Sequence, residues 1–238
     1  MYRQILVSLS ILFIISTLIS FSAHAQDKKA SGTTPTYKLA GSTRLVSEFI
    51  DRGLSMSDHN PAMNADFLFD LGSQFRVGFW GSNISNLNRV DDNFWFKLMG
   101  EIHIDIQAAS TLRIYINDDH FYKSNERNGQ SLGGKLEYLL YTGQLEYMTN
   151  YEGTHTGGVY INFGKSKYVK TDLRVGGKFG YTIQSANNHT NYVDVKAFTN
   201  YQFTSNSLFE LGLTLTTEGS QFGTRGNPAI YGMIELVF

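Results

Sequence analysis

The sequence predicts an all-β fold: a transmembrane antiparallel β-barrel of the outer membrane with about 12 strands. A short apolar N-terminal segment has the features of an export signal, and the rest of the chain alternates apolar and polar residues with a period of two. Beyond that segment, no apolar run approaches the length of a membrane-spanning helix. Such a chain can cross a membrane only as a closed barrel, because other folds would leave backbone groups unpaired in lipid.

The N-terminal segment matches the three parts of a secretory signal peptide, predicted at 1–25. Arg3 precedes the apolar run ILVSLSILFIISTLISF, and the small-x-small motif Ala23-His24-Ala25 predicts cleavage after Ala25. An uncleaved membrane anchor is the alternative. We then expect a polar periplasmic lead-in at 26–35 and the barrel at 36–238. The chain contains no cysteine, which excludes disulfides and lipid attachment to a cysteine.

The strands follow from the alternation, and the segment FWFKLMGEIHIDI at 94–106 is the clearest example. Every second residue from Phe94 is apolar or glycine, while Lys97, Glu101 and Asp105 lie on the opposite face. The pattern predicts strands at 37–52, 61–70, 74–82, 93–106, 110–118, 133–142, 144–152, 156–164, 169–184, 190–204, 207–217 and 228–238. Longer polar loops are predicted at 53–60, 83–92, 119–132, 153–155, 185–189 and 218–227. Short turns opposite longer loops, with an even strand count, are typical of outer-membrane barrels and place both termini on the periplasmic side.

A soluble β-sandwich or lipocalin-like barrel would show the same alternation with its apolar faces turned inward. Strand length favours the membrane, because a tilted strand needs ~9–11 residues to span the bilayer, whereas strands of soluble proteins average about 5–6. Aromatic residues also lie near the predicted strand ends, where interfacial girdles form. They are Tyr37, Phe49, Phe79, Phe94, Tyr151, Phe163, Tyr201, Phe203, Phe209 and Phe238.

The polar strand faces predict a narrow lumen of mixed charge. The predicted lumen-lining residues are Arg44, Glu48, Arg52, Asp66, Asp70, Arg76, Lys97, Glu101, His103, Asp105, Arg113, Lys135, Glu137, Glu146, Arg174, Lys178, Asp194, Lys196, Glu210 and Glu235. They include nine Arg and Lys and ten Asp and Glu, which argues against strong ion selection. Two interpretations stay open: the charges line a solute pathway, or they pair across the lumen and close it. Arg52, Arg76 and Arg113 are candidates for a local basic track.

Other chemistry is weakly represented. The formal net charge is −1 and no basic face develops, so we expect no nucleic-acid partner. His103 lies between Glu101 and Asp105 on one strand face without a serine beside it, so a catalytic pair is not indicated. The DDH segment at 118–120 has the ligand types of a metal site but suits a solvated loop. We predict no enzyme, no cofactor and no metal.

Two segments resemble motifs of a known family. LVSEFIDRGLSMSDHNPA, residues 45–62, resembles the N-terminal motif of the TorF family of exported proteobacterial porins, and GFWGSN, residues 78–83, resembles its next motif. The matching residues are Ser47, Phe49, Arg52, Gly53, Gly78, Trp80, Ser82 and Asn83. The family usually has Tyr in place of Phe49, a mild departure. The resemblance implies a barrel and a pore and implies no catalytic residue.

The C-terminal segment AIYGMIELVF is similar to the closing strand of outer-membrane proteins in general, which ends in Phe and is recognised by the barrel assembly machinery. The residues that match this assembly signal are Ile230, Ile234, Leu236 and Phe238. They share one strand face, which we expect to meet lipid, while Tyr231 and Glu235 lie on the lumen face.

The function predicted from these features is that of an outer-membrane porin for small hydrophilic solutes. Its expected partners are outer-membrane lipid, the barrel assembly machinery and the solutes themselves; the oligomeric state stays open. Two alternatives remain. One is a structural or receptor-type barrel with a largely closed interior, and the other is an outer-membrane lipid hydrolase.

Overall fold

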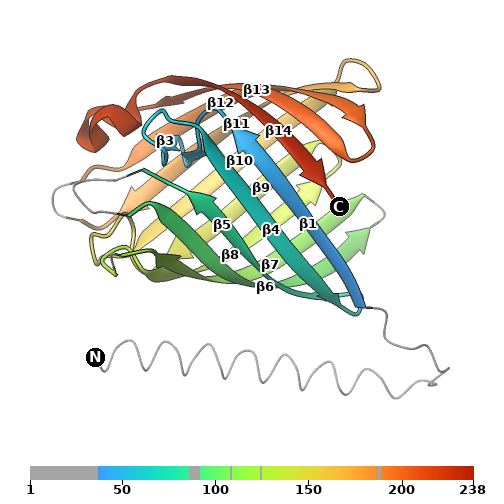
Figure 1. Cartoon of the computed structure of the whole chain (residues 1–238), viewed down its shortest axis with the longest axis horizontal. Helices are drawn as coiled ribbons and strands as arrows, with labels where there is room; N and C mark the ends of the chain where they lie inside the picture. The colour runs from blue at the N-terminus through green and yellow to red at the C-terminus, as the bar shows by residue number, and fades with distance from the viewer. Residues whose placement is uncertain (1–36, 86–91, 108, 124, 187–188) are drawn as a thin grey trace. The chain divides into compact units, whose positions relative to one another are not determined.

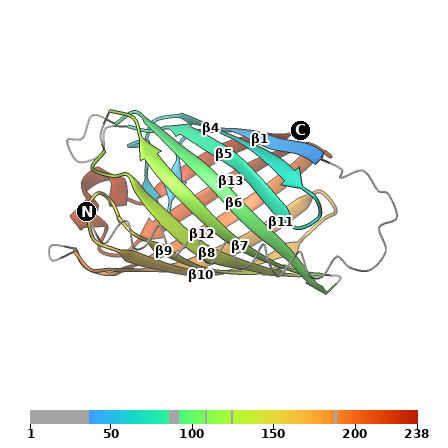
Figure 2. The ribbon, with the colours of Figure 1, turned by 90° about the horizontal axis from the view of Figure 1, so that it is seen from below.

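The computed structural model describes residues 37–85, 92–107, 109–123, 125–186 and 189–238, so the predicted signal peptide and lead-in lie outside the described residues. Twelve antiparallel strands form a closed barrel in which β1 pairs with both β4 and β14 (Figures 1 and 2). The predicted barrel and its strand number are confirmed. Closure pairs every strand on both sides, so no sheet edge is left in the membrane.

The barrel strands run in chain order, and a small hairpin, β2–β3, follows the first of them. The elements are β1 (Tyr37–Val46), β2 (Ile50–Asp51), β3 (Leu54–Ser55), β4 (Ala62–Leu71), β5 (Phe75–Asn83), β6 (Phe94–Gln107), β7 (Ser110–Phe121), β8 (Gly129–Tyr138), β9 (Tyr141–Met148), β10 (Gly158–Tyr168), β11 (Leu173–Gln184), β12 (Tyr192–Thr204), β13 (Ser207–Thr216), the 3-10 helix η1 (Gly219–Gly226) and β14 (Ala229–Val237).

Several predicted boundaries are wrong. The strands predicted at 144–152, 156–164 and 169–184 are Tyr141–Met148, Gly158–Tyr168 and Leu173–Gln184 in the structure. The first strand ends at Val46, not at residue 52. The turn between β8 and β9 lies at Leu139, which has a φ of 53°, and not at Thr142-Gly143. Positive φ is unusual for leucine, so the sequence pattern placed the turn at the glycine, three residues too late. Finally, β7 and β8 extend into the predicted loop at 119–132, which shortens it.

The apolar strand faces point outward. Leu39, Leu45 and Ile230 are 58%, 56% and 74% exposed, and large apolar side chains cover the outside of all twelve barrel strands in the same way. A soluble barrel would bury these residues, because exposed apolar patches of this extent mark a membrane or partner surface. Among the described residues, no helix is long and apolar enough to cross a bilayer.

The two ends of the barrel differ. Short turns and the C-terminus lie at one end, while η1 and the β2–β3 hairpin lie at the other (Figure 1). We call the latter end the outer mouth, following the topology of outer-membrane barrels. Phe49 and Tyr151 were predicted to belong to the outward aromatic girdles. This is wrong: Tyr151 is 3% exposed, and Phe49 packs against a buried cluster inside the mouth.

Candidate functional site

The inside of the barrel contains two sizeable cavities. One of about 440 Å³ is bordered by β9–β14, and one of about 390 Å³ is bordered by β4–β7. Arg44, Asp51, Arg52, Gln144 and Glu146 line both. A third cavity of about 180 Å³ lies among β8–β13. The two larger cavities therefore meet at Asp51 and Arg52.

Most of the predicted lumen residues line these cavities. They are Arg44, Glu48, Arg52, Asp66, Arg76, Lys97, Glu101, Arg113, Lys135, Glu137, Glu146, Arg174, Lys178, Asp194, Lys196 and Glu210. Glu235 pairs with Arg44 at 2.6 Å, and His103 pairs with Glu101. Asp105 lines none of the three cavities and accepts a hydrogen bond from Thr111 (3.1 Å).

The predicted basic track is neutralised by carboxylates. Arg76 lies 2.6 Å from Asp70 and 3.7 Å from Glu101. Arg113 pairs with Glu137. Arg76 and Arg113 thus each have a carboxylate on a neighbouring strand. The alternation of residues along one strand cannot reveal such pairs, because they depend on the register between strands.

A segment between β1 and β4, residues 47–61, turns into the barrel; we call it the inward segment. Arg52 and Gly53 form its tip, with φ values of 48° and 76°. Positive φ at both central residues is the conformation of a tight hairpin turn, and glycine is favoured there. A Cβ on Gly53 would lie 2.4 Å from the side chains of Asp194 and Thr216. The tip therefore touches the barrel wall at a place where only glycine fits.

The tip is anchored to three barrel strands. Arg52 Nη2 lies 3.1 Å from Glu146 Oε1 on β9. Tyr192 Oη of β12 donates to the Arg52 carbonyl (3.1 Å), and Thr216 Oγ1 of β13 donates to the Gly53 carbonyl (2.7 Å). Arg52 and Glu48 were predicted to face the lumen from the first strand. They instead belong to a segment that occupies the lumen.

The two sequence motifs meet in space. The Phe49 ring centroid lies 5.6 Å from that of Trp80, joining the inward segment to β5. At the root of the segment, the Gly232 backbone N–H donates to Ser47 Oγ (2.9 Å). On β5, Asn83 Oδ1 accepts from the Met63 backbone N–H (2.6 Å). The motif residues thus build the inward segment and the wall against which it rests.

Apolar side chains of the inward segment fill the outer mouth. Leu54 is 1% exposed and packs with Tyr192 and Phe222, and Met56 is 1% exposed and packs with Trp95. Fully burying such side chains contributes about 1.5–3 kcal/mol each. Together they favour the inward position by about 3–6 kcal/mol, or roughly 100-fold to 20,000-fold. The inward segment is thus held stably in place and narrows the outer mouth.

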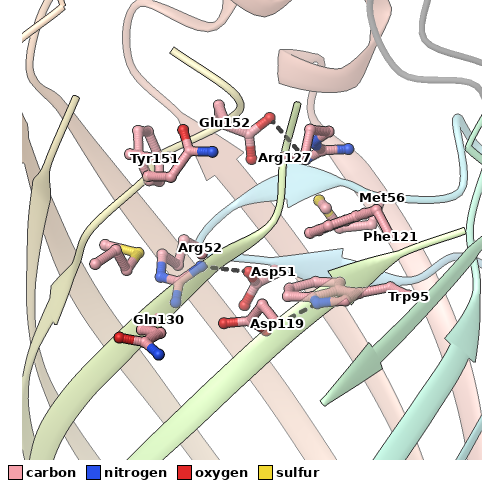
Figure 3. Close-up of a pocket in the computed structure, with 13 residues that line it drawn as sticks. Asp51, Arg52, Met56, Trp95, Asp119, Phe121, Arg127, Gln130, Tyr151 and Glu152 are labelled. Atoms are coloured by element: carbon pink, nitrogen blue, oxygen red, sulfur yellow. Dashed lines mark hydrogen bonds and ion pairs between the residues drawn. The ribbon is translucent and has the colours of Figure 1, made fainter. Parts of the chain in front are cut away.

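Three loops are joined above the constriction by a buried ion cluster. Glu152 Oε2 lies 3.1 Å from Arg127 of the β7–β8 loop (Figure 3). The same oxygen lies 2.8 Å from Arg225 of η1. Arg225 Nε also donates to the Ser55 carbonyl (2.9 Å), which ties the cluster to the inward segment. Burial alone would raise the pKa of Glu152, but the two guanidinium groups hold this pKa at about 2. None of these three residues was singled out from the sequence, because their loops are far apart along the chain.

A histidine links the inward segment to η1. His59 Nδ1 lies 2.8 Å from Glu48 Oε1, and His59 Nε2 lies 2.8 Å from the Thr224 carbonyl. Both ring nitrogens thus face acceptors, which suits the protonated ring. The Thr224 hydrogen bond is the largest cause that raises the pKa of His59; burial opposes it, and Glu48 adds to the rise.

Glu152→Gln is expected to destabilise the outer mouth by about 3–5 kcal/mol, because it removes the carboxylate that two buried arginines share. Both tryptophans of the chain, Trp80 and Trp95, lie in or against the mouth cluster, so intrinsic fluorescence during urea titration measures this region. Exposed Glu218, changed to Gln, is the control. Equal urea midpoints for the two variants would contradict the role of Glu152.

The same cluster predicts a pH dependence. The pKa of Glu152 is lowered from 4.5 to about 2 in the folded chain. Its stabilisation is therefore complete above pH 4.5 and is lost as pH falls toward 2. Tryptophan fluorescence of the wild type should stay constant down to about pH 4.5 and shift as the pH falls from there toward 2.

One protein-family model matches most of the chain. A model described as "Bacterial protein of unknown function (Gcw_chp)" matches residues 29–225. The chain belongs to the Gcw_chp family. This match does not include the narrower TorF name, and no curated protein matches the Gcw_chp chain.

Several solved membrane-protein structures share the fold of this chain. The KdgM porin is 8% identical with a TM-score of 0.54, over 84% of this chain and 98% of that chain. The COG4313 outer membrane channel from Pseudomonas putida F1 is 10% identical with a TM-score of 0.53, over 89% and 99%. A protein from work on in-meso crystallization of membrane proteins is 13% identical with a TM-score of 0.58, over 85% and 83%. The fold thus matches outer-membrane barrels of Gram-negative bacteria.

Proposed function

We propose that the chain is an outer-membrane channel for small hydrophilic solutes, narrowed at its outer mouth by the inward segment. The observation that carries this proposal is the polar interior: cavities of about 440 and 390 Å³ meet at Asp51 and Arg52 and are lined by charged side chains of both signs. The solvated polar interior of a barrel of this size admits water and small solutes. The resemblance to TorF family porins supports the same function.

The second candidate is a structural or receptor barrel with a closed interior. It is favoured by the apolar packing around Leu54 and Met56 and by the Glu152 ion cluster, which together fill the described part of the outer mouth. In this case the loops, and not the lumen, would carry the function.

The lipid hydrolase has less support. The His103 ring pairs with Glu101, a carboxylate on the same strand, and stands opposite Arg113 in the sheet. A hydrolase of this kind requires a nucleophile within hydrogen-bond reach of its base. In the described part of the chain, the His103 ring is hydrogen-bonded to Glu101 and to no serine or threonine hydroxyl.

Planar-bilayer recording of detergent-refolded protein tests the channel. We expect small, discrete conductance steps, because the constriction leaves only a narrow path. Folding is checked independently by the heat-modified mobility of the barrel in gel electrophoresis. A folded barrel without any conductance step would overturn the channel and favour the closed barrel. Release of fatty acid from phospholipid by the same sample would instead favour the hydrolase.

A further inference from the structure

One wall of the lumen has an excess of positive charge. The cavity of about 180 Å³ is lined by cations on the inner faces of β8, β11 and β12. These lumen-facing cations are Lys135, Arg174, Lys178 and Lys196, and the carboxylates on the same cavity are Glu137 and Glu210. The sequence-wide balance of charge inside the barrel therefore conceals a local imbalance.

Two of the cations stand directly opposite each other in the sheet. Lys178 of β11 pairs in register with Lys196 of β12. Like charges at directly opposite positions are destabilising. On the other side of Lys178 the neighbour is Gly164, where a Cβ would lie 3.0 Å from Lys178 Cγ and 2.6 Å from Thr142 Oγ1. The missing side chain leaves room for the Lys178 stem along the wall.

The counter-charges on this wall are already shared. Glu210 Oε1 lies 2.7 Å from Lys196 Nζ and also accepts a hydrogen bond from Tyr231 Oη (2.6 Å). Glu137 pairs with Lys135 (2.7 Å) and also with Arg113. In the described part of the chain, Lys178 and Arg174 have no carboxylate within 4.0 Å. Arg174 Nη2 donates to the Asn200 amide oxygen (2.9 Å), which is uncharged. The positive charges of both residues are therefore left for a mobile anion.

Lys178 and Lys196 also lie between two spaces. Both line the cavity of about 440 Å³ behind the inward segment and the cavity of about 180 Å³. A solute moving between these cavities passes their ammonium groups. Lysine ammonium groups bind carboxylate and phosphate oxygens as point charges, and arginine can add a bidentate contact.

We propose that Lys178, Lys196 and Arg174, with Lys135, form an oxyanion-binding site in the lumen that makes the channel prefer small carboxylates and phosphates over cations. This inference rests on the proposed channel function for its biological role, while the site itself can be tested without conduction.

The first test is the reversal potential in a salt gradient. The wild type is expected to prefer anions, and Lys178→Gln combined with Lys196→Gln is expected to lower the anion-to-cation permeability ratio about threefold or more. Lys167→Gln is the matched control, because Lys167 is an exposed lysine of β10 on the outward face. A ratio that is unchanged in the double variant would overturn the site.

The second test separates the site from the channel. Isothermal titration calorimetry of the detergent-refolded full chain uses inorganic phosphate in one arm and citrate in the other, which distinguishes phosphate from carboxylate ligands. Binding weakened about tenfold in the Lys178→Gln, Lys196→Gln variant, but not in Lys167→Gln, supports the site even if no conductance is seen. That result would contradict the proposed channel function and support the proposed anion-binding site. Binding that is absent, or equal in all three proteins, overturns the site.

Discussion

Replacing residues 49–56 by a glycine-serine linker of the same length is expected to raise the single-channel conductance about threefold or more. The replacement removes the buried Leu54 and Met56 side chains and the Arg52 contact with Glu146, which hold the inward segment in the lumen. Planar-bilayer recording measures the effect. A conductance equal to that of the wild type would show that the inward segment does not limit flow.

A single substitution tests the same idea with a matched control. Gly53 and Gly72 both have positive φ, 76° and 78°, so alanine strains the backbone at either position. Only Gly53 faces a wall, with Asp194 and Thr216 atoms 2.4 Å from its would-be Cβ; nothing lies within 4 Å at Gly72. Gly53→Ala should therefore displace the tip and raise conductance, whereas Gly72→Ala should not. A similar effect from both variants would assign the change to backbone strain alone.

Deleting Phe238 is expected to lower the yield of assembled barrel about tenfold. The backbone N–H and carbonyl of Phe238 both bond to Gly41 at 3.0 Å, and its ring centroid lies 5.6 Å from that of Phe67. The loss of two hydrogen bonds costs about 1–3 kcal/mol at the seam where β14 closes on β1. The last strand also resembles the signal that the barrel assembly machinery recognises. We therefore expect the deletion to slow assembly as well as to weaken the seam.

The measurement is the heat-modifiable fraction of the protein in isolated outer membranes. Phe203→Ala serves as the control, because Phe203 is another outward aromatic residue, 47% exposed, in β12. If both changes lower the yield equally, the lipid-facing aromatic surface would explain the loss. If neither does, Phe238 would have no special role at the seam.

The alternation of residue types determined the strands and their number without help from the tertiary structure. Period two is a local property of the backbone, so a stretch such as 94–106 predicts its own length and its two faces. The same parity placed Lys178, Lys196 and Glu210 together on the inner faces. It also placed Ile234 and Leu236 on the outside, where they are 44% and 52% exposed.

The constriction and the charge imbalance were decided only by the tertiary structure. Arg52 and Gly53 belong to a sequence that continues the first strand's alternation, and their turn is set by contacts with Tyr192 and Thr216, which lie 140 and 163 residues further along the chain. Glu152 likewise meets Arg225 only because the barrel closes.

The charges illustrate the same physical reason. Nine cations and ten carboxylates appear balanced in the sequence, but strand register decides which of them meet. Register gives Arg76 two carboxylates and gives Lys178 another lysine. Composition and parity are local and additive along the chain, whereas electrostatic pairing depends on distances between strands that only the closed barrel defines.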